Sequence, residues 1–325
     1  MIQFRPAVTS EAKPLIGLYA QSGCGKSYSS LLLAKGFTGN MEQVGMIETE
    51  SGRGEVFADD PVVGGYRVCS IRDDFSPKAY HAALREAEKA HLRALILDSA
   101  SHEWEGAGGV LSMAAANQAA GKKGPLVWQQ PKIDHQREFL LPLLQTPIAL
   151  VIVNMRAKFP MVEVNKGGAK EWQRSTELEP KQSEDILFEM MVHGWIDQQH
   201  RLHVTKYTKD TFKTIFLDGQ PITVETGQRL AAWATGVKAA APTAPANQPP
   251  QATPDALLKA QFKRLMAFAQ GDRELAKRIL GTVTGEWGAA MQSFNDMTSE
   301  EVQRFADTSD DALRDAATRA AERSE

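Results

Sequence analysis

Residues 15–37, LIGLYAQSGCGKSYSSLLLAKGF, constrain the fold more than any other stretch of the sequence. An apolar run leads into a glycine-rich turn, and Lys26 and Ser27 then begin a stretch that reads as a helix. A strand that passes into a helix through such a turn is typical of α/β folds, in which backbone N–H groups at the start of the helix bind phosphate. The stretch therefore predicts an α/β fold with a phosphate site at this turn.

The turn matches the phosphate-binding pattern GxxxxGK(S/T), known as Walker A, except at its first position, where Ala20 replaces glycine. We expect the alanine to be tolerated, because this glycine supplies steric freedom at the loop entrance and the later residues meet the phosphates. Lys26 would bind the β- and γ-phosphates and Ser27 would bind Mg²⁺. The residues expected to contact the nucleotide are Ala20, Gln21, Ser22, Gly23, Cys24, Gly25, Lys26, Ser27 and Tyr28. The alternative is a glycine-rich turn that binds no nucleotide.

Further short apolar runs follow at 44–48, 66–71, 94–98 and 148–154. Near-continuous apolar strands that alternate with helical stretches are typical of a mostly parallel sheet covered by helices on both faces. Two later runs, ILFEMMVHGWI and RLHVTKYTK, are joined by the short polar DQQH. We expect these two runs to extend the sheet in the antiparallel sense.

An alanine- and proline-rich stretch, residues 237–254, divides the chain. It carries one charge and too little apolar surface to form a core, so we expect a flexible linker. Residues 255–325 show apolar residues at helical spacing and a capping-box pattern at Thr298 and Glu301. The prediction is a nucleotide-binding core at residues 1–236, the linker, and a small all-helical domain at 255–325 that contacts a protein partner.

Acidic residues near strand ends would complete the site. Asp98 ends the run ALILD, which is the Walker B arrangement that holds hydrated Mg²⁺. Glu50 follows the run VGMIE, close to the carboxyl end of its strand, where ligands of α/β proteins bind. We expect Glu50 to activate the attacking water. Glu103 and Glu105, in SHEWEG, are the alternatives for that role.

Taken together, these motifs resemble the RecA-like ATPase core. The resemblance rests on GLYAQSGCGKS, LILDSASHEWEG, VNMRAK and FEMMV, and it is closest to phage-encoded RecA-like or AAA-type ATP-binding proteins. It covers about residues 12–235 and implies a RecA-like P-loop fold, with ATP and Mg²⁺ as ligands. It also implies roles for Lys26 and Ser27 at the phosphates and metal, Asp98 at the metal, Glu50 at the water, and Asn154 and Arg156 at the γ-phosphate.

RecA-like recombinases bind single-stranded DNA through two loops, and the corresponding residues here are 107–132 and 156–182. Both stretches combine lysines with tryptophan, and such residues neutralise phosphates and stack on bases. The resemblance therefore implies a DNA-dependent ATPase in phage-type recombination or single-strand annealing. It also implies a homo-oligomer, in which Lys206 and Lys209 would reach into a neighbouring site.

Charge and composition leave other functions open. The chain has a formal net charge of −3, so a DNA contact would have to rest on local loops. The second loop could instead be a lid over ATP with ordinary solvated lysines. A P-loop kinase or other phosphotransferase, or an ATP-gated binding module with weak hydrolysis, would use the same phosphate groups. Two cysteines and no long apolar run favour a cytoplasmic protein that makes no membrane contact.

Overall fold

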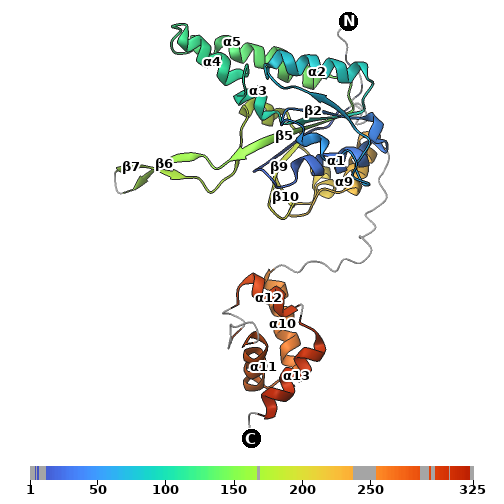
Figure 1. Ribbon diagram of the computed structural model, residues 1–325, viewed down its shortest axis with the longest axis vertical. Helices are drawn as coiled ribbons and strands as arrows, with labels where there is room; N and C mark the ends of the chain where they lie inside the picture. The colour runs from blue at the N-terminus through green and yellow to red at the C-terminus, as the bar shows by residue number, and fades with distance from the viewer. Residues whose placement is uncertain are drawn as a thin grey trace. The chain divides into compact units, whose positions relative to one another are not determined.

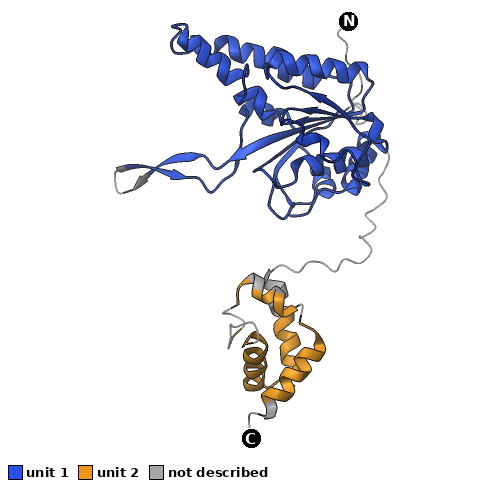
Figure 2. Ribbon diagram, in the orientation of Figure 1, with its two compact units in different colours: residues 1–240 blue, residues 241–325 orange. Residues whose placement is uncertain are grey.

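The computed structural model (Figure 1) describes residues 4, 6, 12–166, 169–236, 254–285, 293, 297–306 and 308–322. The chain forms two compact units, residues 1–240 and 241–325 (Figure 2). The expected linker, residues 237–254, lies outside the described residues except for Pro254, with which a helix begins.

The first unit is built on an eight-stranded sheet in the order β10-β9-β1-β5-β4-β2-β3, with β8 paired to β5. The strands are β1 (Leu15–Ala20), β2 (Val44–Glu48), β3 (Arg67–Ser70), β4 (Ala94–Asp98), β5 (Leu150–Lys158), β8 (Glu179–Pro180), β9 (Val192–Ile196) and β10 (Leu202–Tyr207). All neighbours in this order pair in parallel except β10, which is antiparallel to β9. The mostly parallel α/β sheet expected from the sequence is therefore confirmed.

The run ILFEMMVHGWI departs from its prediction. Its first four residues complete α7 (Glu184–Glu189), and only its last five residues form β9. β9 pairs with β1 in the parallel sense. Of the two runs, the second alone, as β10, extends the sheet in the antiparallel sense.

Helices cover both faces of the sheet (Figure 1). On one face lie α1 (Lys26–Thr38), α8 (Thr211–Ile215) and α9 (Val224–Ala234). On the other lie α2 (Pro77–Lys89), the π-helical segment η4 (His135–Leu140) and α6 (Leu141–Gln145). Successive side chains of a strand point to opposite faces, so Ile16 and Leu18 of β1 pack on the α1 side while Leu15 and Tyr19 pack on the α2 side. The unit also contains the short helices η2 (Met41–Gln43), η3 (Arg53–Glu55) and α3 (Ser101–Glu105).

The two stretches expected to be DNA-binding loops both contain regular structure. The first, 107–132, is not a loop, because most of it folds into the helices α4 (Val110–Ala119) and α5 (Leu126–Asp134). The second, 156–182, contains the antiparallel strands β6 (Met161–Lys166) and β7 (Ala169–Arg174). The strands β6 and β7, here called the arm, project away from the central sheet (Figure 1).

The second unit consists of helices in its described residues: α10 (Pro254–Phe268), α11 (Arg273–Gly285), α12 (Ser299–Ala306) and α13 (Asp310–Glu322). Its core includes Ile279, Phe305 and Leu313. The expected capping box is confirmed, since the Thr298 N–H donates to the Glu301 carboxylate at 2.8 Å and the Glu301 N–H donates to the Thr298 hydroxyl at 3.3 Å. In the described part of the chain, every helix is too short or too polar to cross a bilayer.

Candidate functional site

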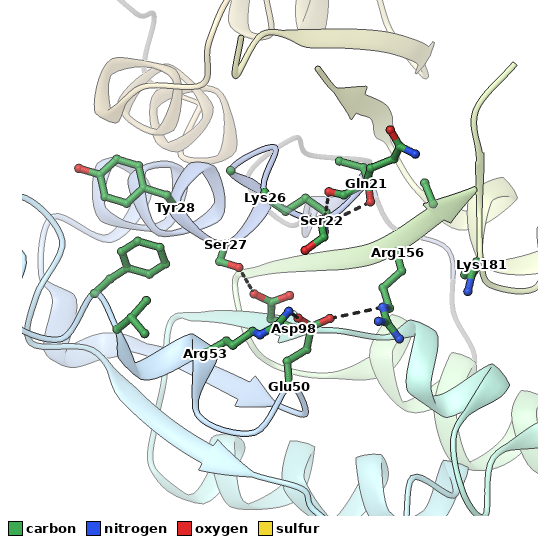
Figure 3. A pocket seen from close by; sticks show the side chains of 16 residues that line it. Gln21, Ser22, Lys26, Ser27, Tyr28, Glu50, Arg53, Asp98, Arg156 and Lys181 are labelled. Carbon is green, nitrogen blue, oxygen red and sulfur yellow. Dashed lines mark hydrogen bonds and ion pairs between the residues drawn. The ribbon is translucent and has the colours of Figure 1, made fainter. Parts of the chain in front are cut away.

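A cavity of about 530 Å³ opens at the carboxyl ends of β1, β4 and β5 (Figure 3), the edge at which parallel sheets bind ligands. Its lining combines the glycine-rich turn with residues that follow β2 and β5. The lining residues are Ala20, Gln21, Ser22, Gly23, Gly25, Lys26, Ser27, Tyr28, Glu50, Arg53, Val56, Phe57, Asp98, Arg156, Ala157 and Lys181. All the residues expected to contact the nucleotide are therefore in this lining except Cys24.

The glycine-rich turn explains why alanine is accepted at its first position. The left-handed backbone positions in the turn are Gly23 and Gly25, both with φ of 87°. Ala20 ends β1 with 1% of its surface exposed, and its side chain packs in the core on the α1 side. The loop therefore needs no left-handed backbone conformation at position 20, and alanine is accepted there.

Lys26 is bound inside this turn. Its amine donates to the carbonyls of Ala20 at 3.3 Å and Gln21 at 3.2 Å. Burial lowers the pKa of Lys26, while the carboxylates of Asp98 and Glu50 act in the opposite direction. A buried amine beside loop carbonyls is poised to exchange these acceptors for stronger, anionic ones.

Cys24 and His200 lie behind the turn. The Cys24 side chain is 4% exposed and belongs to the core, so a nucleotide contact by this residue would come from its backbone N–H, and that contact stays a prediction. The carbonyl of Cys24 accepts a hydrogen bond from Nδ1 of His200 at 3.0 Å. A Cβ added at Gly25 would lie 2.7 Å from the same ring nitrogen, so space as well as φ requires glycine there. His200, in the turn between β9 and β10, has no motif in the sequence that could have placed it.

Ser27 and Asp98 form the candidate metal site. The Ser27 hydroxyl, on α1, donates to Oδ2 of Asp98 at the end of β4. Burial raises the pKa of Asp98 to about 6, although the hydrogen bond from Ser27 and the charge of Lys26 both lower it. Within the described residues, no group of three or more His, Cys, Asp or Glu side chains could hold a metal ion. The donor set fits Mg²⁺, which needs only one or two protein oxygens and takes its other ligands from phosphate and water.

Of the three acids considered as activators of water, Glu50 is the one that lines the cavity. Its side chain is 22% exposed and lies 3.6 Å from both Arg53 and Arg156. Glu103 is fully buried, 3.0 Å from Nδ1 of His135. Glu105 lies outside the lining and pairs with Arg156 and Lys181. The arrangement favours Glu50, and its action on water stays a prediction.

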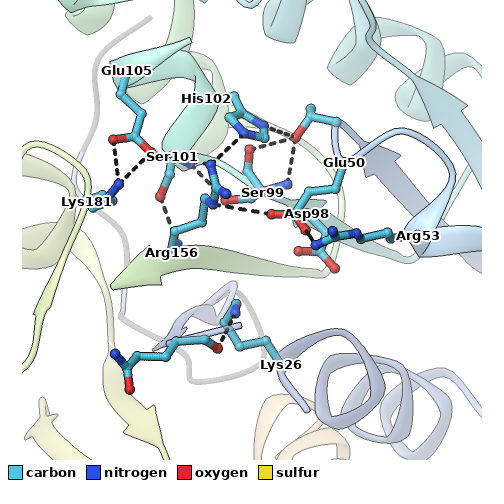
Figure 4. A network of polar contacts seen from close by, with 12 residues as sticks. Lys26, Glu50, Arg53, Asp98, Ser99, Ser101, His102, Glu105, Arg156 and Lys181 are labelled. Carbon is cyan, nitrogen blue, oxygen red and sulfur yellow. Dashed lines mark hydrogen bonds and ion pairs between the residues drawn. The ribbon is translucent and has the colours of Figure 1, made fainter. Parts of the chain in front are cut away.

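Arg156, on β5, is bound from several sides (Figure 4). Its Nη1 donates to Nε2 of His102 at 3.2 Å, and Nη1 also lies 3.6 Å from Glu105. A guanidinium can only donate, so Nε2 of His102 accepts and Nδ1 carries the proton, which it donates to the Thr49 hydroxyl at 2.7 Å. Burial, and then the charge of Arg156, lowers the pKa of His102, which keeps this ring neutral.

Asn154, Lys206 and Lys209 do not line the cavity. Asn154 is fully buried beside Asp98 in the sheet register, and its Oδ1 accepts from the Ser30 hydroxyl of α1 at 2.7 Å. It is not part of the lining, so its γ-phosphate contact stays a prediction. The Lys206 amine donates to the carbonyl of Phe188 at 2.7 Å, at the end of α7, whereas Lys209 is exposed. The oligomer also stays a prediction.

Arg53, Val56 and Phe57 are lining residues to which sequence reasoning gave no role. The sequence did hold a signal for them, because they follow the carboxyl end of β2 and lie close to Glu50. Lys181 was expected only as part of the second DNA-binding loop, or of a lid over ATP, and the return of the chain beside β5 brings it to the cavity. The rings of Tyr28 and Phe57 lie 5.3 Å apart and form an apolar end of the cavity.

The charge of the cavity differs from that of the whole chain. Its described lining contains four cationic side chains and two carboxylates, in a protein with a net charge of −3. A cationic pocket in an acidic protein is suited to an anionic ligand. No protein-family model and no curated protein matches this chain.

Proposed function

We propose that the protein binds ATP with Mg²⁺ and hydrolyses it. The observation that carries this proposal is the hydrogen bond from Ser27 to Asp98, at the mouth of a turn that holds Lys26. The hydroxyl and the carboxylate come from different elements, and a Walker A serine and a Walker B aspartate meet in this way to share one metal ion. The alternative reading as a plain turn before a helix does not account for this pairing.

The lining residues can be given roles in hydrolysis. Phosphate oxygens would replace the carbonyls that Lys26 now contacts, and Ser27 and Asp98 would hold Mg²⁺, which neutralises phosphate charge when bound. Glu50 would take a proton from water as the water attacks the terminal phosphorus and the bond to the ADP oxygen breaks. Arg156 would stabilise the charge that develops on the phosphoryl oxygens.

The two ends of the cavity support one orientation for the nucleotide. Figure 3 shows Tyr28 on one side, Lys26 and Ser27 between, and Arg156 on the other side. An apolar wall of Tyr28 and Phe57 suits the nucleobase, because aromatic rings stack on its flat faces. The triphosphate would then extend along the turn, with its terminal phosphate toward Arg156.

Mutation of the turn and the metal site tests this proposal. Mg²⁺-dependent release of phosphate from ATP should be lost in Lys26→Ala and in Asp98→Ala. Lys277→Ala, which removes an exposed lysine of the second unit, is the control and should retain activity. Full hydrolysis in both cavity variants would refute the site.

Single-stranded DNA is the proposed regulator of this hydrolysis, in the recombination or annealing role that the resemblance to phage-encoded RecA-like proteins implies. The arm supports this role. Trp172 is 68% exposed and Met161 is 56% exposed. Residues 158–174 carry four basic and two acidic side chains, which makes this segment more cationic than the chain as a whole. Exposed rings with nearby cations suit stacked bases and their phosphates.

The roots of the arm lie at the nucleotide cavity. Ala157 and Lys158, at the end of β5, pair with Pro180 and Glu179 of β8. DNA on the arm could therefore act on the residues that contact the terminal phosphate. Labelled single strands titrated at two salt concentrations, with and without ATP, test this role. Absence of both ATP-dependent binding and DNA-stimulated hydrolysis would favour a phosphotransferase or an ATP-gated binding module.

A further inference from the structure

Lys181 is a cation of the nucleotide cavity that belongs to neither Walker motif. It directly follows β8, and its backbone N–H donates to the carbonyl of Arg156 at 2.7 Å. Its side chain lines the same cavity as Lys26 and Asp98 and lies beside Arg156, at the end far from Tyr28 (Figure 3). Two cations from adjacent strands thus converge at one end of the cavity.

Glu105 of α3 binds both of these cations (Figure 4). Its Oε2 lies 3.1 Å from Nζ of Lys181, and its Oε1 lies 3.6 Å from Nη1 of Arg156. Glu50 lies 3.6 Å from Nε of Arg156. These ion pairs are only partly shielded from solvent, with 46% of the Arg156 side chain and 32% of the Lys181 side chain exposed. Such pairs are weak, so a polyphosphate that enters the cavity can compete with Glu105 for its partners.

We propose that Lys181 binds the terminal phosphate of the nucleotide together with Arg156, and that Glu105 holds the two cations until that phosphate arrives. This inference rests on the proposed function. The turn would bind the inner phosphates and Lys26 the β- and γ-phosphates, and Lys26 lies nearer Tyr28 than Lys181 does (Figure 3). A nucleoside diphosphate lacks the group that Lys181 and Arg156 would share, so these cations distinguish ATP from ADP.

The position of Lys181 also links this contact to the arm. The chain leaves the cavity at Arg156 and Ala157, forms the arm, and returns through β8 to Lys181. A phosphate held by Lys181 and Arg156 therefore ties together the two roots of the arm. Release of that phosphate after hydrolysis returns both cations to Glu105.

Dissociation constants for Mg²⁺-ADP and for a non-hydrolysable Mg²⁺-ATP analogue, measured by calorimetry on the full chain, test the proposal. Lys181→Ala should weaken binding of the triphosphate about tenfold or more, as expected for a charge-assisted phosphate contact, and leave ADP binding unchanged. Lys181→Arg should retain most of the wild-type affinity for the triphosphate, because it keeps the positive charge. Glu105→Gln should tighten triphosphate binding several-fold without an effect on ADP, because the cations lose their competing carboxylate.

Lys89→Ala is the control, since it removes an exposed lysine of the same unit that lies outside the cavity lining and outside the arm, and it should leave both affinities unchanged. Equal losses for both nucleotides in Lys181→Ala, or none for either, would overturn the assignment of Lys181. If circular dichroism shows that Lys181→Ala is unfolded, Glu105→Gln tests the proposal in its place. A ratio of ATP-analogue affinity to ADP affinity that is the same in Glu105→Gln as in the wild type would then overturn the proposal. A wild-type chain that binds neither nucleotide would refute the proposed function as well.

Discussion

Asp98 should destabilise the nucleotide-free protein, and Asp98→Asn should therefore stabilise it. The carboxyl group is 6% exposed, and burial raises its pKa from 3.8 to about 6. A folded state with the higher pKa binds the proton more tightly than the unfolded chain does. The stabilisation from this proton is complete below pH 3.8 and is lost as the pH rises through 6, so the ionised carboxylate is a cost at neutral pH.

The free-energy cost of the ionised Asp98 carboxylate follows from its pKa shift. A difference of about 2 pH units corresponds to about 3 kcal/mol of unfolding free energy at pH 7 and above. Asparagine keeps a side-chain oxygen that can accept from Ser27 but carries no charge, so it should recover most of that energy. For a unit of this size, about 3 kcal/mol corresponds to a rise in Tm of roughly 6 to 12 °C.

Differential scanning calorimetry of both chains between pH 4 and pH 8, with EDTA and without nucleotide, measures this effect. The Tm advantage of Asp98→Asn should be largest at pH 7 to 8 and should vanish toward pH 4. Asp197→Asn is a control of opposite sign. Burial raises the pKa of Asp197, but hydrogen bonds from His203 and Arg201 outweigh it and lower the pKa to about 2. The loss of that carboxylate should lower Tm across this whole range.

An Asp98→Asn variant that is no more stable than the wild type at pH 8 would refute this reasoning. So would an advantage that does not change with pH, because it would not come from ionisation. With Mg²⁺ and ATP present the order should reverse, since a ligand that binds the folded wild type stabilises it by mass action.

Three further outcomes are expected. Glu50→Gln should bind ATP normally but lower turnover by about 10² to 10⁴ in a single-turnover assay, as expected for loss of a general base, and unchanged turnover would return attention to Glu105. Trp172→Ala should weaken single-stranded DNA binding by about 1 to 3 kcal/mol in fluorescence anisotropy, while Phe188→Ala, a 73% exposed ring outside the arm, should have no effect. Gly227→Ala places a Cβ 2.2 Å from the carbonyl of Leu33 and should lower thermal stability by about 1 to 3 kcal/mol; an unchanged Tm would contradict the tight packing of α9 on α1.

The order of strands and helices was largely predictable because it depends on local patterns. A short apolar run between polar stretches indicates a buried strand wherever it lies in the chain. Residues 107–132 were predicted wrongly as a loop, because the resemblance to RecA-like recombinases implied one there, while most of these residues form α4 and α5. The run ILFEMMVHGWI was only partly predicted, since it continues from the end of α7 into β9 as one mostly apolar stretch, and periodicity does not separate short helices from short strands.

The turn at Gly23 to Ser27 and the carboxylate of Asp98 could be predicted from the sequence alone, because each motif consists of one strand and the residues that directly follow it. Tertiary structure alone decided that Glu50 lines the cavity while Glu103 is buried against His135, and that Lys181 joins Arg156 at Glu105. These contacts depend on which strands lie side by side and in what register. That pairing is set by burial of the whole sheet between two layers of helices, which no short stretch of sequence encodes.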